Sequence, residues 1–304
     1  MAVVVGIGEL LWDLLPGGKQ LGGAPSNFAY ISSLLGDRAV VVSRVGDDLL
    51  GKEAIQQLQM IGVEPGRVQI DSTHPTGTVE VSIDDHGLPD FRIAANVAWD
   101  YLEWNDGLQG LAMEADIICF GSLAQRQEPS RSTIHRFLRA TRESCLRIFD
   151  VNLRQSYYDA IVLKTGLALA TVVKVNDGEL PVVLESCGLP SISDDTADAE
   201  LLLEHFGMEL VCVTRGQKGS LLLAKDKRSE HPGFRVPVAD TVGAGDAFTA
   251  TFAHYYHAGH SLNDINDAAN RMASWVASQP GATPSATPEE IAELLGTHQA
   301  SSNG

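Results

Sequence analysis

The stretch DTVGAGDAFTA, residues 240–250, carries the strongest structural signal in this 304-residue chain. Small residues at 243–245 allow the backbone to turn tightly into a helix that starts near Gly245. The first amides of such a helix have no partner within it and lie at the positive end of the helix dipole. They therefore predict a binding site for an anion that needs no basic side chain.

Asp246 lies in the first turn of this predicted helix. The helix dipole favours the ionised carboxylate there, and an ionised carboxylate can accept a proton. An anion site beside a carboxylate is what phosphoryl transfer to a hydroxyl group requires, because the amides stabilise the phosphoryl group while the carboxylate deprotonates the acceptor. In an isolated glycine turn Asp246 would be an ordinary first-turn residue, so the choice depends on the rest of the chain.

Upstream of this stretch, apolar runs of strand length alternate with segments of helical spacing. The first run is VVVGIG at residues 3–8, which is typical of a central strand buried on both faces. Helices are expected at residues 26–35 and 50–61. Further strands are expected at residues 39–43, 116–120, 146–150, 171–175 and 210–214. Strands that alternate with helices predict a mostly parallel sheet and an α/β fold.

One segment, residues 77–93, breaks the alternation. GTVEVSI at 77–83 alternates apolar and polar residues, a turn is expected at 84–87, and DFRI returns at 90–93. This pattern predicts a hairpin with one face toward solvent. Together with residues 9–15 it is expected to form a small antiparallel flap. The exposed edge of such a flap is either mobile or paired with a second subunit, in which case a homodimer forms through it.

Composition excludes several classes of function. The formal net charge of −17 argues against binding to nucleic acid or to an anionic membrane. No segment reaches the length of an uncharged membrane span, and the apolar N-terminus is interrupted by Glu9 and Asp13 and lacks the basic start of a signal peptide. The four cysteines form no CxxC pair, and three of them lie in apolar surroundings, which is typical of core residues in a reduced compartment. We therefore expect a cytoplasmic protein.

A second glycine-rich stretch, GGAPSNFA at residues 22–29, predicts a tight loop that opens a helix. Backbone at Gly22 and Gly23 can approach a polyhydroxylated ligand closely, and the Asn27 amide can both donate and accept hydrogen bonds. With its spacing to Gly36 and Gly46, this stretch and residues 240–250 resemble the two signatures of the ribokinase/phosphofructokinase-B superfamily of carbohydrate kinases. Residues 150–154 (DVNLR), 176–179 (NDGE) and 214–219 (TRGQKG) resemble internal motifs of that family, in family order.

This resemblance implies a ribokinase-like three-layer sandwich, in which helices flank a mostly parallel central sheet and a small β-sheet forms a lid. It implies one kinase domain over residues 1–296, with the lid formed by about residues 9–23 and 72–98. Residues 297–304 are polar and are expected to be a frayed tail.

The resemblance also implies roles for individual residues. Asp246 is similar to the catalytic base of the family. The implied anion hole consists of Gly243, Ala244 and Gly245. Positions that match sugar-binding residues are Asp13, Gly23 and Asn27, and Arg154 would reach a substrate oxygen or phosphate. Positions that match nucleotide-binding residues are Asn176, Glu179, Thr214, Gly216 and Asn270.

Two metal ions follow from the same resemblance, beside ATP. Glu179 would organise Mg²⁺ through water, since Mg²⁺ prefers oxygen ligands and retains its waters. Potassium-dependent relatives hold their ion where this chain has Asp240, Val242, Val276, Gly281 and Ser285. The alternative for these five residues is a plain buried loop, and the sequence leaves both open.

The choice of sugar rests on shorter stretches. ELLWDLLP at 9–16, PTGTV at 75–79, AWD at 98–100 and DVNLR at 150–154 resemble the fructokinase branch, which converts fructose to fructose 6-phosphate. Tyr157 and Tyr158 depart from the Leu-Trp pair of many fructokinases. The alternatives are a kinase for 2-keto-3-deoxygluconate, ribose or a nucleoside and, in another class, a catalytically idle sugar-sensing protein. The intact Asp246 and its glycines argue against an idle protein.

Overall fold

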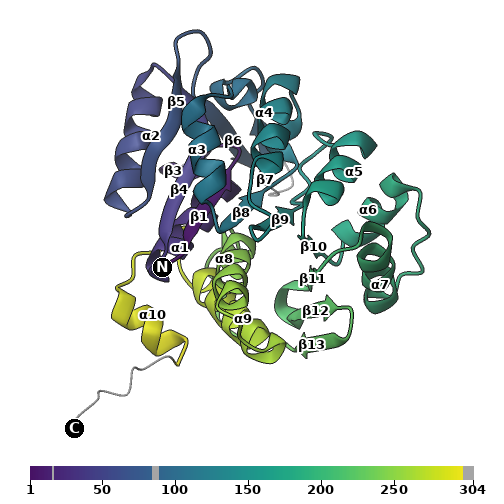
Figure 1. Ribbon diagram of the computed structural model, residues 1–304. Helices are drawn as coiled ribbons and strands as arrows, with labels where there is room; N and C mark the ends of the chain where they lie inside the picture. Colours follow the sequence, from purple (N-terminus) through teal and green to yellow (C-terminus); the bar gives the residue numbers. More distant parts are fainter. Residues whose placement is uncertain (16, 84–88, 297–304) are drawn as a thin grey trace.

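Most of the apolar runs form one nine-stranded sheet, in a computed structural model that describes residues 1–15, 17–83 and 89–296 (Figure 1). The strand order is β13-β12-β11-β10-β9-β8-β1-β4-β5. Neighbours from β5 to β11 are parallel, whereas β12 and β13 pair antiparallel. The strands are β1 (Val3–Ile7), β4 (Arg38–Gly46), β5 (Glu64–Asp71), β8 (Ile117–Phe120), β9 (Leu146–Asp150), β10 (Val172–Asn176), β11 (Leu210–Thr214), β12 (Ser220–Ala224) and β13 (Lys227–His231). The predicted α/β class and the mostly parallel sheet are confirmed.

Helices cover both faces of this sheet because the strand side chains alternate between two apolar clusters. In β1, Val5 and Ile7 belong to one cluster and Val4 belongs to the other. The first cluster includes residues of α3 (Asp106–Glu114), α4 (Glu128–Arg139), α5 (Ala160–Leu169), α6 (Glu179–Cys187) and α7 (Asp195–Phe206). The second includes residues of α1 (Ala24–Leu34), α2 (Leu49–Met60), α8 (Ala244–His257), α9 (Leu262–Ala277) and α10 (Pro288–Leu294). Three 3₁₀ helices complete the helical elements, η1 (Ala98–Tyr101), η2 (Leu123–Gln125) and η3 (Gly216–Lys218).

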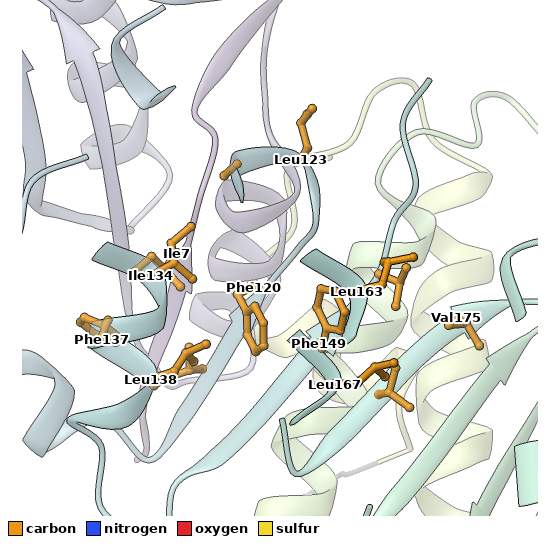
Figure 2. Packing of buried hydrophobic residues seen from close by; sticks show 14 of the residues in the cluster. Ile7, Phe120, Leu123, Ile134, Phe137, Leu138, Phe149, Leu163, Leu167 and Val175 are labelled. Carbon is orange, nitrogen blue, oxygen red and sulfur yellow. The ribbon is translucent and has the colours of Figure 1, made fainter. Parts of the chain in front are cut away.

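The core beneath α4 and α5 fixes the middle of the sheet (Figure 2). Phe120 of β8 and Phe149 of β9 stack with ring centroids 4.9 Å apart, and both are fully buried. Phe137 packs in the same cluster from α4, as does Leu163 from α5. Each such side chain contributes about 1.5–3 kcal/mol to folding. This packing holds the carboxyl ends of β8 and β9 in register, and the candidate site lies at those ends.

The order of the strands creates a switch point beside β1. From β1 the chain proceeds to β4 and β5 on one side, and it later returns through β8 to build the other side. Ligands of open α/β sheets bind at the carboxyl ends of strands at such a point. Gly8 and Glu9 follow β1 there, and Gly121 follows β8.

A second, four-stranded sheet has the order β3-β2-β6-β7. Its strands are β2 (Leu11–Leu15), β3 (Gly18–Gly22), β6 (Gly77–Ile83) and β7 (Pro89–Ile93). The predicted hairpin is confirmed, since β6 and β7 pair antiparallel. The predicted antiparallel flap is wrong in one pairing, because β2 and β6 are parallel. Strand β2 follows β1 in the chain, and β6 follows β5. Because β1 and β5 run in the same direction, the chain leaves the large sheet at the carboxyl ends of its strands both times, and β2 and β6 therefore run in the same direction.

Three further sequence expectations have simpler outcomes. The turn expected at 84–87 and the tail at 297–304 lie outside the described residues. The four cysteines are free and buried, as expected of core residues. Over residues 1–15, 17–83 and 89–296, no helix is both long enough and apolar enough to cross a membrane.

Candidate active site

A pocket of about 580 Å³ lies between the small sheet and the carboxyl ends of the central strands. It brings together half of the site residues expected from the sequence, although these are distributed along the whole chain. They are Asp13, Gly23, Asn27, Arg154, Asp240, Val242, Gly243, Gly245 and Asp246. The pocket is also lined by Glu9 and Lys174, which were not predicted as site residues.

The start of α8 forms one wall of the pocket. Gly243 caps the helix with φ 79°, a left-handed conformation, and a Cβ at this position would lie 2.6 Å from the Ala282 Cβ. Both facts require glycine there. The helix begins at Ala244, and its first intrahelical hydrogen bond runs from the Ala247 N–H to the Gly243 carbonyl at 2.8 Å. The Ala244 N–H donates to the Thr241 carbonyl at 3.3 Å, which leaves the amides of Gly245 and Asp246, in the first turn of a 14-residue helix, as the donors for an anion.

Asp246 is half-buried in the first turn of α8, and its Oδ2 accepts a hydrogen bond from Asn27 Nδ2 at 2.8 Å. Burial raises the pKa of Asp246 to about 6, and the charge of Asp150 adds to this effect. The hydrogen bond from Asn27 and the charge of Lys174 act in the opposite direction. The sequence led us to expect that the helix dipole would hold the carboxylate ionised, but burial outweighs the dipole. A pKa of about 6 still leaves the group mostly ionised at neutral pH, as a general base requires.

Two buried acceptors near Asp246 lack hydrogen-bond partners. Glu9 is 4% exposed, and its Oε1 accepts a hydrogen bond from the Ala24 N–H at 3.3 Å. Glu9 Oε2 and Asn27 Oδ1 are buried, and neither has a partner among the described residues. An unpaired buried acceptor costs about 1–3 kcal/mol, so a ligand that donates hydrogen bonds to both atoms would recover this energy.

Glu9 is a site residue that sequence reasoning missed. Burial raises its pKa to about 7, and the nearby charge of Asp246 adds to the rise. The available signal was its place directly after the buried strand β1, as a charge that interrupts an apolar run. We used that interruption only to exclude a signal peptide.

Asp13 and Arg154 lie on the side of the pocket formed by the small sheet and by the loop after β9. Burial raises the pKa of Asp13 to about 6, and the charge of Arg154 opposes that rise. Arg154 is exposed, and its guanidinium also lowers the pKa of Glu9 and of Asp246. The arginine therefore lies among three carboxyl groups, where it can orient a polar ligand.

Lys174 is the second missed residue of the pocket. It lies in β10 within the apolar run VVKVN, and its side chain is almost fully buried. Burial alone would lower its pKa, but the charges of Asp150, Glu179 and Asp246 outweigh burial and raise it. Lys174 is therefore a permanent cation in the pocket.

The residues expected to bind nucleotide lie at the ends of the next strands, outside this pocket. Asn176 ends β10, and its Oδ1 accepts hydrogen bonds from the N–H groups of Gly178 and Glu179 at 2.9 and 2.8 Å. The two Glu179 oxygens accept from the N–H groups of Leu153 and Asn176 at 2.8 and 2.9 Å. Thr214, which ends β11, is the register partner of Asn176. Gly216 is exposed just beyond Thr214.

Asn270 is not brought to the pocket. It lies in α9, where it is 6% exposed. Its Nδ2 donates hydrogen bonds to Ser220 Oγ at 2.7 Å and to the Asn266 carbonyl at 2.8 Å. The expected contact with adenine thus falls on a side chain whose amide nitrogen is engaged in an internal network.

Asp240 joins the two loops of the expected potassium site. Its Oδ1 accepts a hydrogen bond from the Val242 N–H at 3.0 Å, and its Oδ2 accepts one from the Gly281 N–H at 3.3 Å. Val276 is fully buried, and its carbonyl accepts the Gln279 N–H at 2.9 Å, while Ser285 is exposed. These loops therefore come together at the edge of the pocket through the Asp240 carboxylate.

Comparison with known proteins agrees with this geometry. The family model described as pfkB family carbohydrate kinase matches residues 17–290. The chain is 31% identical to fructokinase-1 of Oryza sativa subsp. japonica over 96% of this chain and 97% of that protein. It is 33% identical to the fructokinase of Salmonella typhimurium over 80% of this chain and 81% of that protein.

A solved structure gives the same match in three dimensions. It is a double mutant of the fructokinase of Vibrio cholerae O395, in a form with fructose, ADP and a potassium ion bound. The TM-score is 0.81 and the identity is 25%, over 97% of this chain and 98% of that chain. The small separate sheet and the large parallel sheet are thus those of ribokinase-like structures.

Proposed function

Because this chain belongs to the pfkB family of carbohydrate kinases and is a sugar kinase, we propose that it transfers the γ-phosphoryl group of ATP to the 6-hydroxyl group of D-fructose. The observation that carries this proposal is the position of Asp246, between the N-terminus of α8 and the unpaired acceptors of Glu9 and Asn27. Donors for those acceptors are what a polyhydroxylated sugar offers.

The chemistry follows from that position. The acceptor hydroxyl gives its proton to the Asp246 carboxylate while its oxygen forms a bond to the γ-phosphorus. The bond between the γ-phosphorus and the bridging oxygen breaks, and ADP leaves with that bond's electron pair. The exposed amides at the start of α8 stabilise the charge on the phosphoryl oxygens during the transfer. Asp246 then releases its proton to solvent, which its pKa of about 6 permits at neutral pH.

Relatives support fructose and ATP as substrates. The rice and Salmonella proteins are named fructokinases, and the Vibrio structure holds fructose and ADP. Asp13 and Arg154 provide further polar groups for the remaining sugar hydroxyls. For Mg²⁺ the donor set fits, since Glu179 and Asn176 present oxygen atoms, and each Glu179 oxygen keeps a lone pair for a metal-bound water. Bound Mg²⁺ would neutralise charge on the phosphates of ATP.

The small sheet serves as a lid in this proposal. Residues of β2, β3 and β6 line the pocket, so the sheet covers the bound sugar and excludes water from the transfer. Among the described strands, β3 and β7 form the two edges of this sheet, and a second subunit can pair with an edge. We expect one kinase domain over residues 1–296. We also expect a homodimer through this sheet, and sedimentation of the full chain would test whether a dimer forms.

A substrate panel tests the proposed acceptor. ADP release is measured with D-fructose, D-ribose, 2-keto-3-deoxygluconate, aldohexoses and nucleosides at equal concentrations. The highest kcat/KM is expected with D-fructose. A higher kcat/KM with another sugar or a nucleoside would replace fructose as the acceptor, and no stimulation by any of them would favour a sugar-sensing protein.

The pH dependence of turnover is a further prediction. Asp246 acts as a base only when ionised, and its pKa is raised to about 6. The rate with saturating fructose should therefore be constant above about pH 7, fall as the pH drops through 6, and decrease tenfold per pH unit below about 5. A rate that is unchanged between pH 7 and pH 5, in protein shown to be folded at both, would exclude this carboxylate as the base.

A further inference from the structure

Lys174 occupies an unusual position for a lysine. Its Nζ lies 3.0 Å from Asp150 Oδ1 and 3.1 Å from Asp150 Oδ2, and both residues stand near the carboxyl ends of adjacent parallel strands. The lysine is 7% exposed and the aspartate 3% exposed. A buried ion pair costs desolvation energy and is weak as a stabilising device, so its position is more informative than its contribution to stability.

The ammonium group lies against the first turn of α8. A Cβ at Gly245 would be 3.1 Å from Lys174 Nζ, so only a glycine leaves the ammonium its full space there. Lys174 and Gly245 line the same pocket. The N-terminus of a helix carries a partial positive charge, which disfavours a cation beside it. The fold therefore holds two positive groups close together, the Lys174 ammonium and the N-terminus of α8. An anion bound in the pocket beside both groups makes this arrangement favourable.

Asp150 fixes this arrangement from the other side. Its Oδ2 also accepts a hydrogen bond from Thr249 Oγ1 at 2.8 Å, and Thr249 lies one turn after Gly245 in α8. Thr249 Oγ1 is also 2.9 Å from the Gly245 carbonyl. The carboxylate thus connects β10 to the second turn of α8, and its two oxygens hold the ammonium from one side. An ammonium has three donors, so one is left for a ligand in the pocket.

We propose that Lys174 is a further catalytic residue, which contacts the phosphoryl group in transfer and completes the anion site at the start of α8. Asp150 and Thr249 act as positioning residues for its ammonium group. This inference rests on the proposed phosphoryl transfer but is independent of which sugar is the acceptor. Lys174 gives no proton to the reaction, since the sugar proton goes to Asp246. Its charge stabilises the phosphoryl oxygens as the bond to ADP breaks and the bond to the sugar oxygen forms.

The test separates charge from structure with two variants. Lys174→Met removes the ammonium at nearly constant volume, and it leaves the buried Asp150 carboxylate unpaired. The double variant Lys174→Met with Asp150→Asn removes both charges and keeps an oxygen that accepts from Thr249. We expect the single variant to lose about 10²–10³-fold in kcat, the usual effect of removing one donor from an oxyanion site. The double variant should recover the wild-type melting temperature but not kcat.

Arg44→Met is the matched control. Arg44 also forms a buried ion pair, with Asp71 at 2.9 Å, but it does not line the pocket. It should lower the melting temperature and leave kcat unchanged at temperatures where the variant is folded. If the double variant at positions 150 and 174 regains kcat to within about threefold of wild type, Lys174 serves only to neutralise Asp150, and the proposal is overturned.

The outcome of the Lys174 comparison does not depend on which sugar is the acceptor. The variants are compared on whichever sugar the wild-type protein phosphorylates fastest in the panel. If that sugar is not fructose, the proposed acceptor fails while the comparison of Lys174 variants is unaffected. If the wild-type protein phosphorylates fructose and the double variant is fully active, fructose is supported as the acceptor, and Lys174 is excluded as a catalytic residue.

Discussion

Replacing Asp246 with Asn should lower kcat by about 10²–10⁴-fold, the range for the loss of a general base. Asn keeps the shape of the side chain and can still accept the hydrogen bond that Asn27 donates at 2.8 Å, but it cannot take the proton of the sugar hydroxyl. The amides at the start of α8 are unchanged by the substitution. Affinity for ATP, measured by calorimetry, should therefore stay close to that of the wild type.

Asp264→Asn provides the matched control for this prediction. Asp264 occupies the same place in α9, three residues after the N-cap Ser261, but it is outside the pocket. Its replacement should leave kcat unchanged, so any loss seen only at Asp246 is chemical rather than a general effect of a first-turn charge. If Asp246→Asn retained more than about half of the wild-type turnover, this carboxylate would have no place in the mechanism.

The second large effect is expected at Asp13. Replacing it with Ala should raise the KM for the sugar by about 10–100-fold, because a hydrogen bond to a charged group contributes about 1.5–3 kcal/mol. The KM for ATP should change little, since most of the residues expected to bind nucleotide lie at the ends of β10 and β11 or just after them, outside the pocket that Asp13 lines. Initial rates measured with each substrate varied in turn separate the two constants. Asp13→Asn, which keeps a polar oxygen, should show an intermediate rise.

A parallel rise of both constants would contradict the assignment of Asp13. Its carboxylate packs over Gly22, where a Cβ would lie 2.3 Å from Oδ2, so a loss of local structure is the competing explanation. A melting curve of the Asp13→Ala variant distinguishes the two cases. An unchanged melting temperature with a rise confined to the sugar KM supports direct binding.

The central strands and their helices were predictable because their signals are local. Residues 3–8 form a continuous apolar run and residues 146–150 (LRIFD) a mostly apolar one, and the structure contains them as β1 and β9. The strands β5 (EPGRVQID) and β13 (KRSEH) have no such pattern. Both lie at the edges of the large sheet, where polar residues, and even proline, are tolerated. Their pairing depends on a neighbouring strand rather than on their own composition.

The candidate site was predictable only in part, for a similar reason. Asp246, Asn27 and Asp13 lie in recognisable motifs and are brought into one pocket. Lys174 looks like an interruption of an apolar strand until Asp150, in the next strand, and Gly245, in a distant helix, are seen beside it. Glu9 likewise gains meaning only from burial and from its unpaired Oε2. Such contacts join residues far apart in the chain, and no local pattern encodes them.

Identification of the reaction product tests the central claim most directly. The wild-type protein is incubated with ATP, Mg²⁺ and D-fructose, and the sugar phosphate is analysed by ³¹P NMR and by coupling to phosphoglucose isomerase. The account predicts one molecule of fructose 6-phosphate for each ADP released, with the initial rate of its formation lowered about 10²–10⁴-fold by Asp246→Asn. Release of ADP without any sugar phosphate, or formation of the same product at the same rate by the Asp246→Asn variant, would contradict it.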